Sequence, residues 1–306
     1  MDQKKDNEVE IFKILSWVWK KKIALALFSI IIGSCSIYVS LLLPNIYEAT
    51  TLLTSSEGGS GRDPIPSKYS KFAKIGGIAM GAAQGVDPAV LSMAVLTSKQ
   101  FVNKFVAKYE LQTQIMACKG WDSSSDSLIF NEKKYNVNSN TWNIDDDGDS
   151  YKPSSEEIYA HFTNKVMSVS FDEETKMITL SIRHYSPIFA ARIANLLIQE
   201  INNWEKEEAI KLIKENIEYL KTQLDKTRLA EMQKIFYQLI ENQIKELMFA
   251  EVGRDFAFKV VDPAFTPEKK SSPRRSVFAI LGVIGGFLFG ALCLSFPALV
   301  REIKKA

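Results

Sequence analysis

The sequence predicts an α+β membrane protein, with two transmembrane helices flanking a large domain that contains a small sheet and a long helical hairpin. The first observation is a pair of uncharged apolar runs near the two ends of the chain, Ile23–Leu43 and Val277–Val300. Each run has about 20 or more residues, enough for a helix to cross a hydrocarbon core of about 30 Å. The second is a set of short segments that alternate apolar and polar residues, as strands do. The third is a stretch from Ser186 to about Glu251 in which almost nothing breaks a helix.

The two apolar runs divide the chain into five predicted parts. Residues 1–22 form a basic tail, 23–43 a first transmembrane helix, 44–276 the large domain with a helical arm at about 187–252, 277–300 a second transmembrane helix, and 301–306 a second tail. An even number of crossings places both tails on one side of the membrane and the large domain on the other.

Basic residues predict the orientation of the two spans. Six lysines precede the first span and three basic residues follow the second, so both tails are expected in the cytoplasm; they are Lys4, Lys5, Lys13, Lys20, Lys21 and Lys22, then Arg301, Lys304 and Lys305. Four basic residues on the translocated side oppose this orientation, namely Lys269, Lys270, Arg274 and Arg275. Charge bias acts weakly on long translocated domains and the N-terminal cluster usually dominates, so the cytoplasmic assignment of the tails is kept.

A cleaved leader is the alternative interpretation of the first span. Its apolar core begins only after about 22 residues and is longer than the usual 7–15 residues of a signal peptide, with no small-residue cleavage site at its end. The segment Ile32–Cys35 does resemble a bacterial lipoprotein box. The apolar run continues through Leu43, as a span would, which favours the transmembrane interpretation.

Composition indicates a folded domain with two spans. The formal net charge is +2, with 46% hydrophobic and 24% charged residues, and neither value indicates a nucleic-acid-binding surface. Of the three cysteines, Cys35 and Cys293 lie in the predicted spans and Cys118 lies alone in the large domain. No disulfide within that domain can brace it, so core burial and assembly must stabilise it.

Four segments of the large domain are predicted strands. Ile46–Thr54 follows Pro44, and Phe256–Val261 ends shortly before the second span, so both are tethered near one membrane surface and can pair. Val166–Phe171 and Lys176–Arg183 flank a polar turn and are expected to form a hairpin. The part between the first strand and this hairpin is expected to contain a glycine-rich loop, helices and an irregular segment.

The helical arm is predicted to begin at Ser186, where serine caps a helix whose first residue is proline. A coiled-coil seam at 3-4 spacing follows, consisting of Ile210, Ile213, Ile217, Leu220 and Leu224. After the polar residues 225–228 a second seam continues with Leu229, Met232, Phe236, Ile240, Ile244 and Leu247. A turn at 225–228 gives two arms of about 23 residues and roughly 35 Å each, which returns the chain to the last strand. One continuous helix is the alternative.

Several segments together resemble the Wzz-type chain-length determinants, also called polysaccharide co-polymerases. The resemblance covers nearly the whole chain in the same order, in Leu43–Tyr47, Leu96–Ser98, Lys119–Asp122, Leu180–Pro187 and Phe258–Ala264, followed by Pro267 and Pro273. With Pro263, these two prolines form the proline-rich membrane-proximal segment expected of the family. The arm is short beside those of typical O-antigen regulators, and no kinase domain is expected after the second span.

The resemblance implies a location, an assembly and a function. The chain is expected to form a ring-shaped homo-oligomer in the bacterial inner membrane, with its main domain in the periplasm. It would control the chain length of lipopolysaccharide O-antigen or a related glycan. Its expected partners are the membrane polysaccharide polymerase, the lipid-linked glycan and membrane lipids, with no nucleic acid. The alternative is an adaptor for polysaccharide export.

The residues give no sign of an enzyme, a metal site or a cofactor site. The two histidines, His161 and His184, lie in no pattern suited to metal binding or nucleophilic catalysis, and no phosphate-binding loop motif occurs. Residues 143–148 imitate the start of a calcium-binding EF-hand loop, but Ser154 occupies the position where that loop needs glutamate. An acidic cluster at residues 205–208 is interpreted as a solvated helix face. A glycan-polymerising enzyme is therefore disfavoured.

Two glycine patterns remain. The glycine-rich stretch at residues 57–85 is either a flexible linker or a segment that lines the inside of a ring. In the second span Gly282, Gly286 and Gly290 recur every four residues and share one helix face. Small residues at this spacing let helices approach closely, so we expect this face to pack against the first span, a neighbouring protomer or the polymerase, unless the glycines are incidental.

Overall fold

The computed structural model describes residues 21–56, 88–253 and 255–303, and side chains only up to residue 293 in the last helix. These residues form two compact units. One unit joins the chain up to Ile46 with the chain from Lys270 onward, and the other is Tyr47–Lys269. The basic tail up to Lys20 and the glycine-rich stretch at 57–85 lie outside the described residues.

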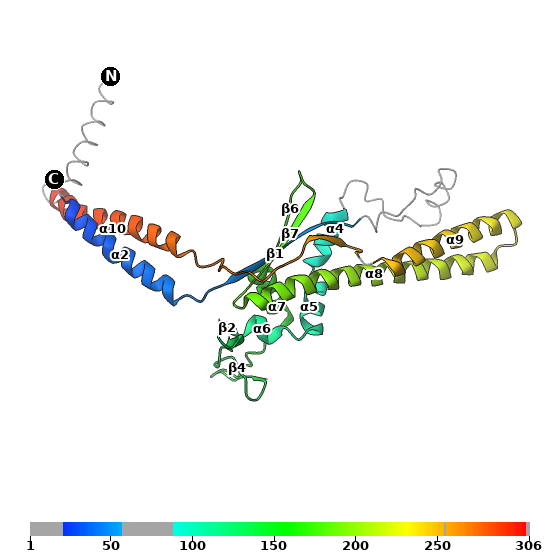
Figure 1. Cartoon of the computed structure of the whole chain (residues 1–306), viewed down its shortest axis with the longest axis horizontal. Helices are drawn as coiled ribbons and strands as arrows, with labels where there is room; N and C mark the ends of the chain where they lie inside the picture. The colour runs from blue at the N-terminus through cyan, green and yellow to red at the C-terminus, as the bar shows by residue number, and fades with distance from the viewer. Residues whose placement is uncertain (1–20, 57–87, 254, 304–306) are drawn as a thin grey trace, which may run out of the picture. The chain divides into compact units, whose positions relative to one another are not determined.

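The first unit is built on two long apolar helices, α2 (Lys22–Leu42) and α10 (Arg275–Ile303). They pack along each other in opposite directions (Figure 1). Both are long and apolar enough to cross a membrane, and side chains such as Ile31 and Leu288 are mostly exposed on their outer faces. A backbone bridge ties the two segments together beyond the helix ends, because the amide of Ile46 donates to the carbonyl of Ser272 over 2.9 Å.

The second unit contains a four-stranded antiparallel sheet with the order β6-β7-β1-β8. The strands are β1 (Tyr47–Ser55), β6 (Met167–Phe171), β7 (Met177–His184) and β8 (Phe258–Asp262). All four predicted strands and the predicted pairing of the first with the last are therefore confirmed. The β1–β8 register shifts between Leu52 and Leu53. The hydroxyl of Thr51 donates to the carbonyl of Asp262 over 2.7 Å near this irregularity.

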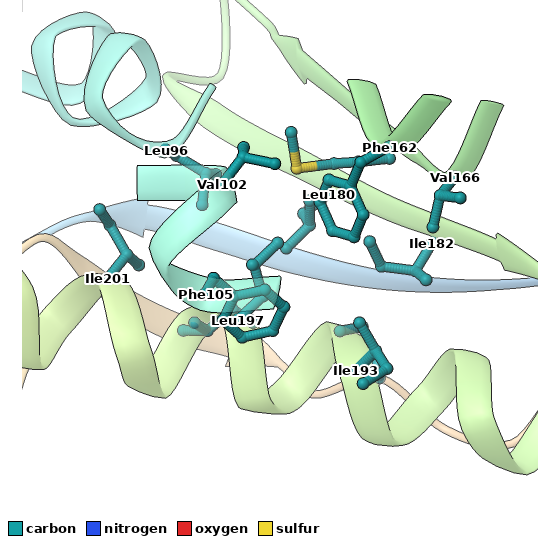
Figure 2. Packing of buried hydrophobic residues seen from close by; sticks show 14 of the residues in the cluster. Leu96, Val102, Phe105, Phe162, Val166, Leu180, Ile182, Ile193, Leu197 and Ile201 are labelled. Carbon is teal, nitrogen blue, oxygen red and sulfur yellow. The ribbon is translucent and has the colours of Figure 1, made fainter. Parts of the chain in front are cut away.

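The core lies between this sheet, α5 (Lys99–Lys108) and the first part of α8 (Pro187–Lys226). Figure 2 shows Phe105 of α5, Leu180 of β7 and Leu197 of α8 gathered in one apolar cluster. Each such side chain contributes roughly 1.5–3 kcal/mol when it is fully buried. The core therefore fixes α8 against the sheet.

Short capped helices complete the core. Ser98 caps α5 by accepting from the amide of Phe101, and Ser154 forms a capping box with Glu157 at the start of α7 (Ser155–His161). A π-helical turn, η2 (Phe162–Val166), leads from α7 into β6. Two further helices are α4 (Pro88–Leu96) and α6 (Gln112–Met116).

The expected irregular segment instead contains two small hairpins, so this prediction was wrong. β2 (Cys118–Asp122) pairs with β3 (Ser127–Phe130), and β4 (Tyr135–Asn136) pairs with β5 (Thr141–Trp142). Their turns depend on side chains that bind the local backbone, as where Asp122 Oδ1 accepts from the amide of Ser124 over 3.0 Å. Asn136 Oδ1 accepts from the amide of Asn138 in the same way.

The arm is a helical hairpin, as predicted, and the continuous-helix alternative is wrong. α8 has 40 residues and α9 (Ala230–Val252) has 23, and the chain reverses between them (Figure 1). Thr227 ends α8 in an extended conformation, while its hydroxyl donates to the carbonyl of Gln223 over 2.9 Å. Gln233 Nε2 donates to the carbonyl of Thr227 over 2.9 Å, which holds the tip closed.

Candidate functional site

The glycine face of α10 lies against α2 within the same chain. A Cβ atom placed on Gly282 would come within 2.6 Å of Ser36 Cβ, and one on Gly286 within 2.8 Å of Ser29 Cα. One on Gly290 would come within 2.9 Å of Phe28 Cβ. Real Cβ atoms do not approach other atoms so closely, so the observed spacing of the two helices requires glycine at these three positions.

The α2 side of this contact is also built from small residues. A Cβ on Gly33 would lie 3.0 Å from Val283 Cγ2, and Ser36 Oγ donates to the carbonyl of Phe278 over 2.8 Å. A side-chain hydrogen bond to a helix carbonyl satisfies polar groups that hydrocarbon could not. Gly285 lies on another face of α10, where an added Cβ would meet nothing within 4 Å.

The arm seam is a second, separate packing surface. Ile217 and Leu220 of α8 are buried against Ile240 of α9, with Ile213 and Leu224 at the edges of this cluster. Of the predicted α8 seam, Ile210 is half-buried and lies outside the cluster. Such a seam holds two antiparallel helices together by apolar packing.

The predicted α9 seam needs correction at three positions. Leu229 is the exposed residue that precedes α9, half-buried Met232 lies outside the cluster, and Ile244 is 44% exposed. The position between Ile240 and Leu247 on the seam is occupied by buried Gln243 instead. Its Nε2 donates to Glu246 Oε2 over 3.0 Å, while its Oε1 has no hydrogen-bond partner among the described residues.

Two asparagines of α8 that no sequence pattern marks as functional bind the last strand and the residues that flank it. Asn202 Oδ1 accepts from the amides of Ala257 (2.7 Å) and Phe258 (2.8 Å), and Asn202 Nδ2 donates to the carbonyl of Phe258 (2.9 Å). Asn195, two turns earlier, exchanges two hydrogen bonds of 2.9 and 3.1 Å with the backbone of Ala264. The two side chains thus satisfy backbone groups of the edge strand β8 and of the residues that flank it.

The sequence contains a signal for this clamp. Asn195 and Asn202 are seven residues apart and therefore share one face of a helix whose neighbouring positions are apolar. From the sequence alone, polar residues in a helix are normally predicted to face solvent. The role of these two asparagines becomes apparent only when the position of the last strand is known.

A buried carboxylate joins α5 to α8. Glu200 accepts from Lys108 Nζ at 2.7 and 2.8 Å and from the hydroxyl of Tyr109 at 2.8 Å. The hydrogen bond to Glu200 raises the pKa of Lys108, and burial followed by that bond raises the pKa of Tyr109. The carboxylate is therefore fully paired and serves packing.

His184 is buried at the end of β7 and is held neutral. Burial lowers its pKa from 6.5 to about 4. Its Nδ1 accepts from the amide of Ser186 over 3.1 Å, so Nε2 carries the proton and donates to the carbonyl of Gln114, also over 3.1 Å. This histidine links β7, α6 and the start of α8.

The remaining predicted features are dispersed. Pro263 directly follows β8, Pro267 is half-buried in the same unit, and buried Pro273 belongs to the unit of α2 and α10.

The acidic segments form local structure. Asp145 Oδ1 accepts from the amides of residues 147 and 149, which makes the EF-hand-like segment a local turn. Glu205 accepts from Ser92 Oγ over 3.1 Å, and burial raises its pKa. Among the described residues, no group of three potential ligands is placed to hold a metal ion.

Comparison with known proteins gives a family match over the first third of the chain. The profile of the family described as "Wzz: Chain length determinant protein" matches residues 7–109, which include α2, β1, α4 and α5. This match confirms the Wzz resemblance over the first third of the chain, where a membrane helix runs into the first strand of the sheet.

Two solved structures are similar to the chain at low identity. A "full-length bacterial polysaccharide co-polymerase" has 12% identity and a TM-score of 0.42, covering 94% of this chain and 97% of that one. A fragment of WzzB, a polysaccharide co-polymerase from Salmonella Typhimurium, has 10% identity and a TM-score of 0.29, covering 74% and 100%. Both TM-scores are below 0.5, so the similarity to the Wzz family rests on the sequence match over residues 7–109. A search of curated proteins gave no match.

Proposed function

We propose that the chain is a non-enzymatic regulator of polysaccharide chain length in the bacterial inner membrane. The observation that carries this function is the Wzz match across the first span and the first strand. The architecture supports it, because two apolar helices flank a single α+β domain that bears a helical arm. Lipopolysaccharide O-antigen or a related glycan is the polymer, and the main domain lies in the periplasm.

The regulator works through its assembled shape. Several copies form a ring that gathers the membrane polymerase and its lipid-linked glycan, and the geometry of the ring biases how many repeats are added before transfer. The α2–α10 pair, held together by its glycine face, anchors each copy in the membrane. The arm extends from a core formed by α5, the sheet and the first part of α8. In this mechanism the chain only positions the polymerase and the lipid-linked glycan, so it needs no acid–base or metal chemistry of its own.

Deletion of the gene tests the function. Surface glycan from the parent, the deletion strain and the complemented strain is separated by gel electrophoresis and compared for length distribution. A regulator gives polymer of altered length in the deletion strain, with the parent distribution restored by complementation. Full-length glycan trapped inside the cell would instead indicate an export adaptor, and complete loss of polymer an enzyme. Either of these outcomes overturns the proposal.

A further inference from the structure

A hollow of about 230 Å³ lies between α8 and β8, beside the hydrogen bonds that join them. Asn202 binds the backbone of Ala257 and Phe258 at the start of β8, and Asn195 binds the backbone of Ala264 shortly after its end. β8 therefore runs antiparallel to this part of α8, and both asparagines contribute to the lining. Sites for drug-sized ligands have roughly 300–1,000 Å³, so the smaller hollow suits a single small ring.

Three amide side chains of α8 form one wall of the hollow. Asn195, Gln199 and Asn203 are exposed and lie four residues apart, so they share one helix face over about 12 Å. Within the described chain, the side chains of Gln199 and Asn203 have no hydrogen-bond partner. The two hydrogen bonds of Asn195 to Ala264 hold its amide in place and use only one N–H and one oxygen lone pair. The wall thus offers unused donors and acceptors, and its first amide is fixed before any ligand binds.

The rest of the lining is apolar apart from one carboxylate. Ile198 of α8, Val260 of β8 and Pro263 supply the apolar surface, and Ile198 is only 3% exposed. Asp255, two residues before the backbone amide of Ala257, supplies the one charged side chain among the described lining residues. The hollow therefore combines C–H surface, amide groups and a single negative charge.

This combination matches the chemistry of a neutral sugar. A pyranose ring presents C–H groups on its faces and hydroxyl groups at its edge, and each hydroxyl both donates and accepts hydrogen bonds. An amide side chain offers a donor and an acceptor next to each other, so it can pair with neighbouring hydroxyls. A carboxylate accepts strong hydrogen bonds from hydroxyls but repels a second carboxylate. The lining should therefore favour a neutral sugar over a uronic acid.

We propose that this hollow binds one neutral sugar ring of the glycan whose length the protein regulates. Gln199 and Asn203 bind hydroxyls of the ring from α8, and Asp255 accepts from a further hydroxyl. Val260 and Pro263 pack against the C–H groups of the ring. The assignment of the sugar to the polymer rests on the proposed function, whereas the preference for a neutral sugar rests on the lining alone.

Saturation-transfer NMR with the full-length protein in lipid nanodiscs tests the hollow. The probes are methyl β-glucoside, which is neutral, and methyl β-glucuronide, which carries a carboxylate; we expect the glucoside to bind more tightly. The double variant Q199A/N203A loses two exposed amides and should bind the glucoside about tenfold more weakly, because two or more hydrogen bonds are lost. Asn242→Ala removes an exposed amide of α9 outside the hollow and should bind like the parent.

A second variant tests the charge through a gain of binding. Asp255→Asn keeps an oxygen that accepts hydrogen bonds but removes the negative charge, so methyl β-glucuronide should bind about as well as the glucoside. A misfolded variant would not acquire this binding. Unchanged discrimination against the glucuronide in Asp255→Asn would overturn the role of the carboxylate.

The other outcomes are equally decisive. No glucoside binding, equal binding by Q199A/N203A and Asn242→Ala, or a parent protein that binds the glucuronide as tightly as the glucoside would each overturn the inference. Glycan released from the surface of the parent strain by mild acid should displace the glucoside; failure to do so would refute the link between the hollow and the polymer. Altered glycan length on gene deletion without sugar binding refutes the hollow alone, whereas sugar binding with glycan unaffected by gene deletion refutes the proposed function alone.

Discussion

Replacing Gly286 with alanine should force α2 and α10 apart. The added Cβ would lie 2.8 Å from Ser29 Cα and 3.0 Å from the carbonyl oxygen of Phe28, both backbone atoms that no rotamer change can move. Carbon atoms pack best at about 3.5–4.0 Å, so the helices must separate locally by about 1 Å. Overpacking of this kind costs roughly 1–3 kcal/mol.

The spacing of the helices can be measured directly in the full protein. Spin labels at Ile31 and Ile284, both exposed on the outer faces of their helices, report the distance between α2 and α10 in nanodiscs. We expect a longer mean distance and a lower midpoint of thermal unfolding for Gly286→Ala, and a larger change for Gly286→Leu. Gly285→Ala is the matched control, because an added Cβ there meets nothing within 4 Å.

The comparison of the two variants decides the argument. If Gly286→Ala and Gly285→Ala gave the same label distance and the same thermal midpoint, close approach at Gly286 would not hold the two helices together. An altered glycan length for Gly286→Leu alone would in addition connect the helix pair to function. Unchanged glycan length and oligomer size with that variant would make the glycine face irrelevant to length control.

Three further predictions concern the large domain. Ile217→Asp should place a charge in the arm seam at a cost of several kcal/mol and shift or abolish the preferred glycan length at parent protein levels, whereas exposed Lys221→Glu should leave the gel profile unchanged; the same profile for both would exclude the arm as the length-setting element. Asn202→Ala should lower the free energy of unfolding by about 1–3 kcal/mol in a denaturant melt, because it strands backbone groups of Ala257 and Phe258, and a melt no different from that of exposed Asn203→Ala would contradict the clamp. Since the pKa of His184 is lowered from 6.5 to about 4, the unfolded chain takes up the proton first as the pH falls, so stability should decline by roughly 3 kcal/mol between pH 6.5 and 4; a His184→Gln variant with the same pH profile would refute this.

The elements predicted from sequence are those with a strong local pattern. The four strands alternate with a period of two and the α8 seam follows 3-4 spacing, while the two apolar runs are recognised by their length. The reversal at Thr227 also follows locally, since polar residues interrupt the seam there. These elements are the two spans, the four-stranded sheet and the helical arm.

The parts that sequence reasoning missed depend on contacts between distant residues or on turn chemistry. The hairpins between Cys118 and Trp142 have strands of two to five residues, too short for a period to be recognised, and they form because residues such as Asp122 bind their own turns. Gln243 replaces Ile244 on the seam because position 243 keeps the phase set by Ile240 and Leu247, whatever its polarity. The clamp by Asn202 requires knowing that β8 passes beside α8.

The hydrogen bonds made by Asn202 and Lys206 fix the position of the α8–α9 arm relative to the core. α8 is a single helix of 40 residues, packed in the core up to Trp204, whose ring meets that of Phe101 at 5.8 Å. Asn202 binds the start of β8, and Lys206, one turn later on α8, binds the last carbonyls of α9. On either side of residue 254, the described parts of the returning chain are thus fixed to adjacent turns of the helix that enters the core. The direction of the arm is therefore set by the packing of the sheet, so a change at Asn202 should disturb the arm even though it lies outside the seam.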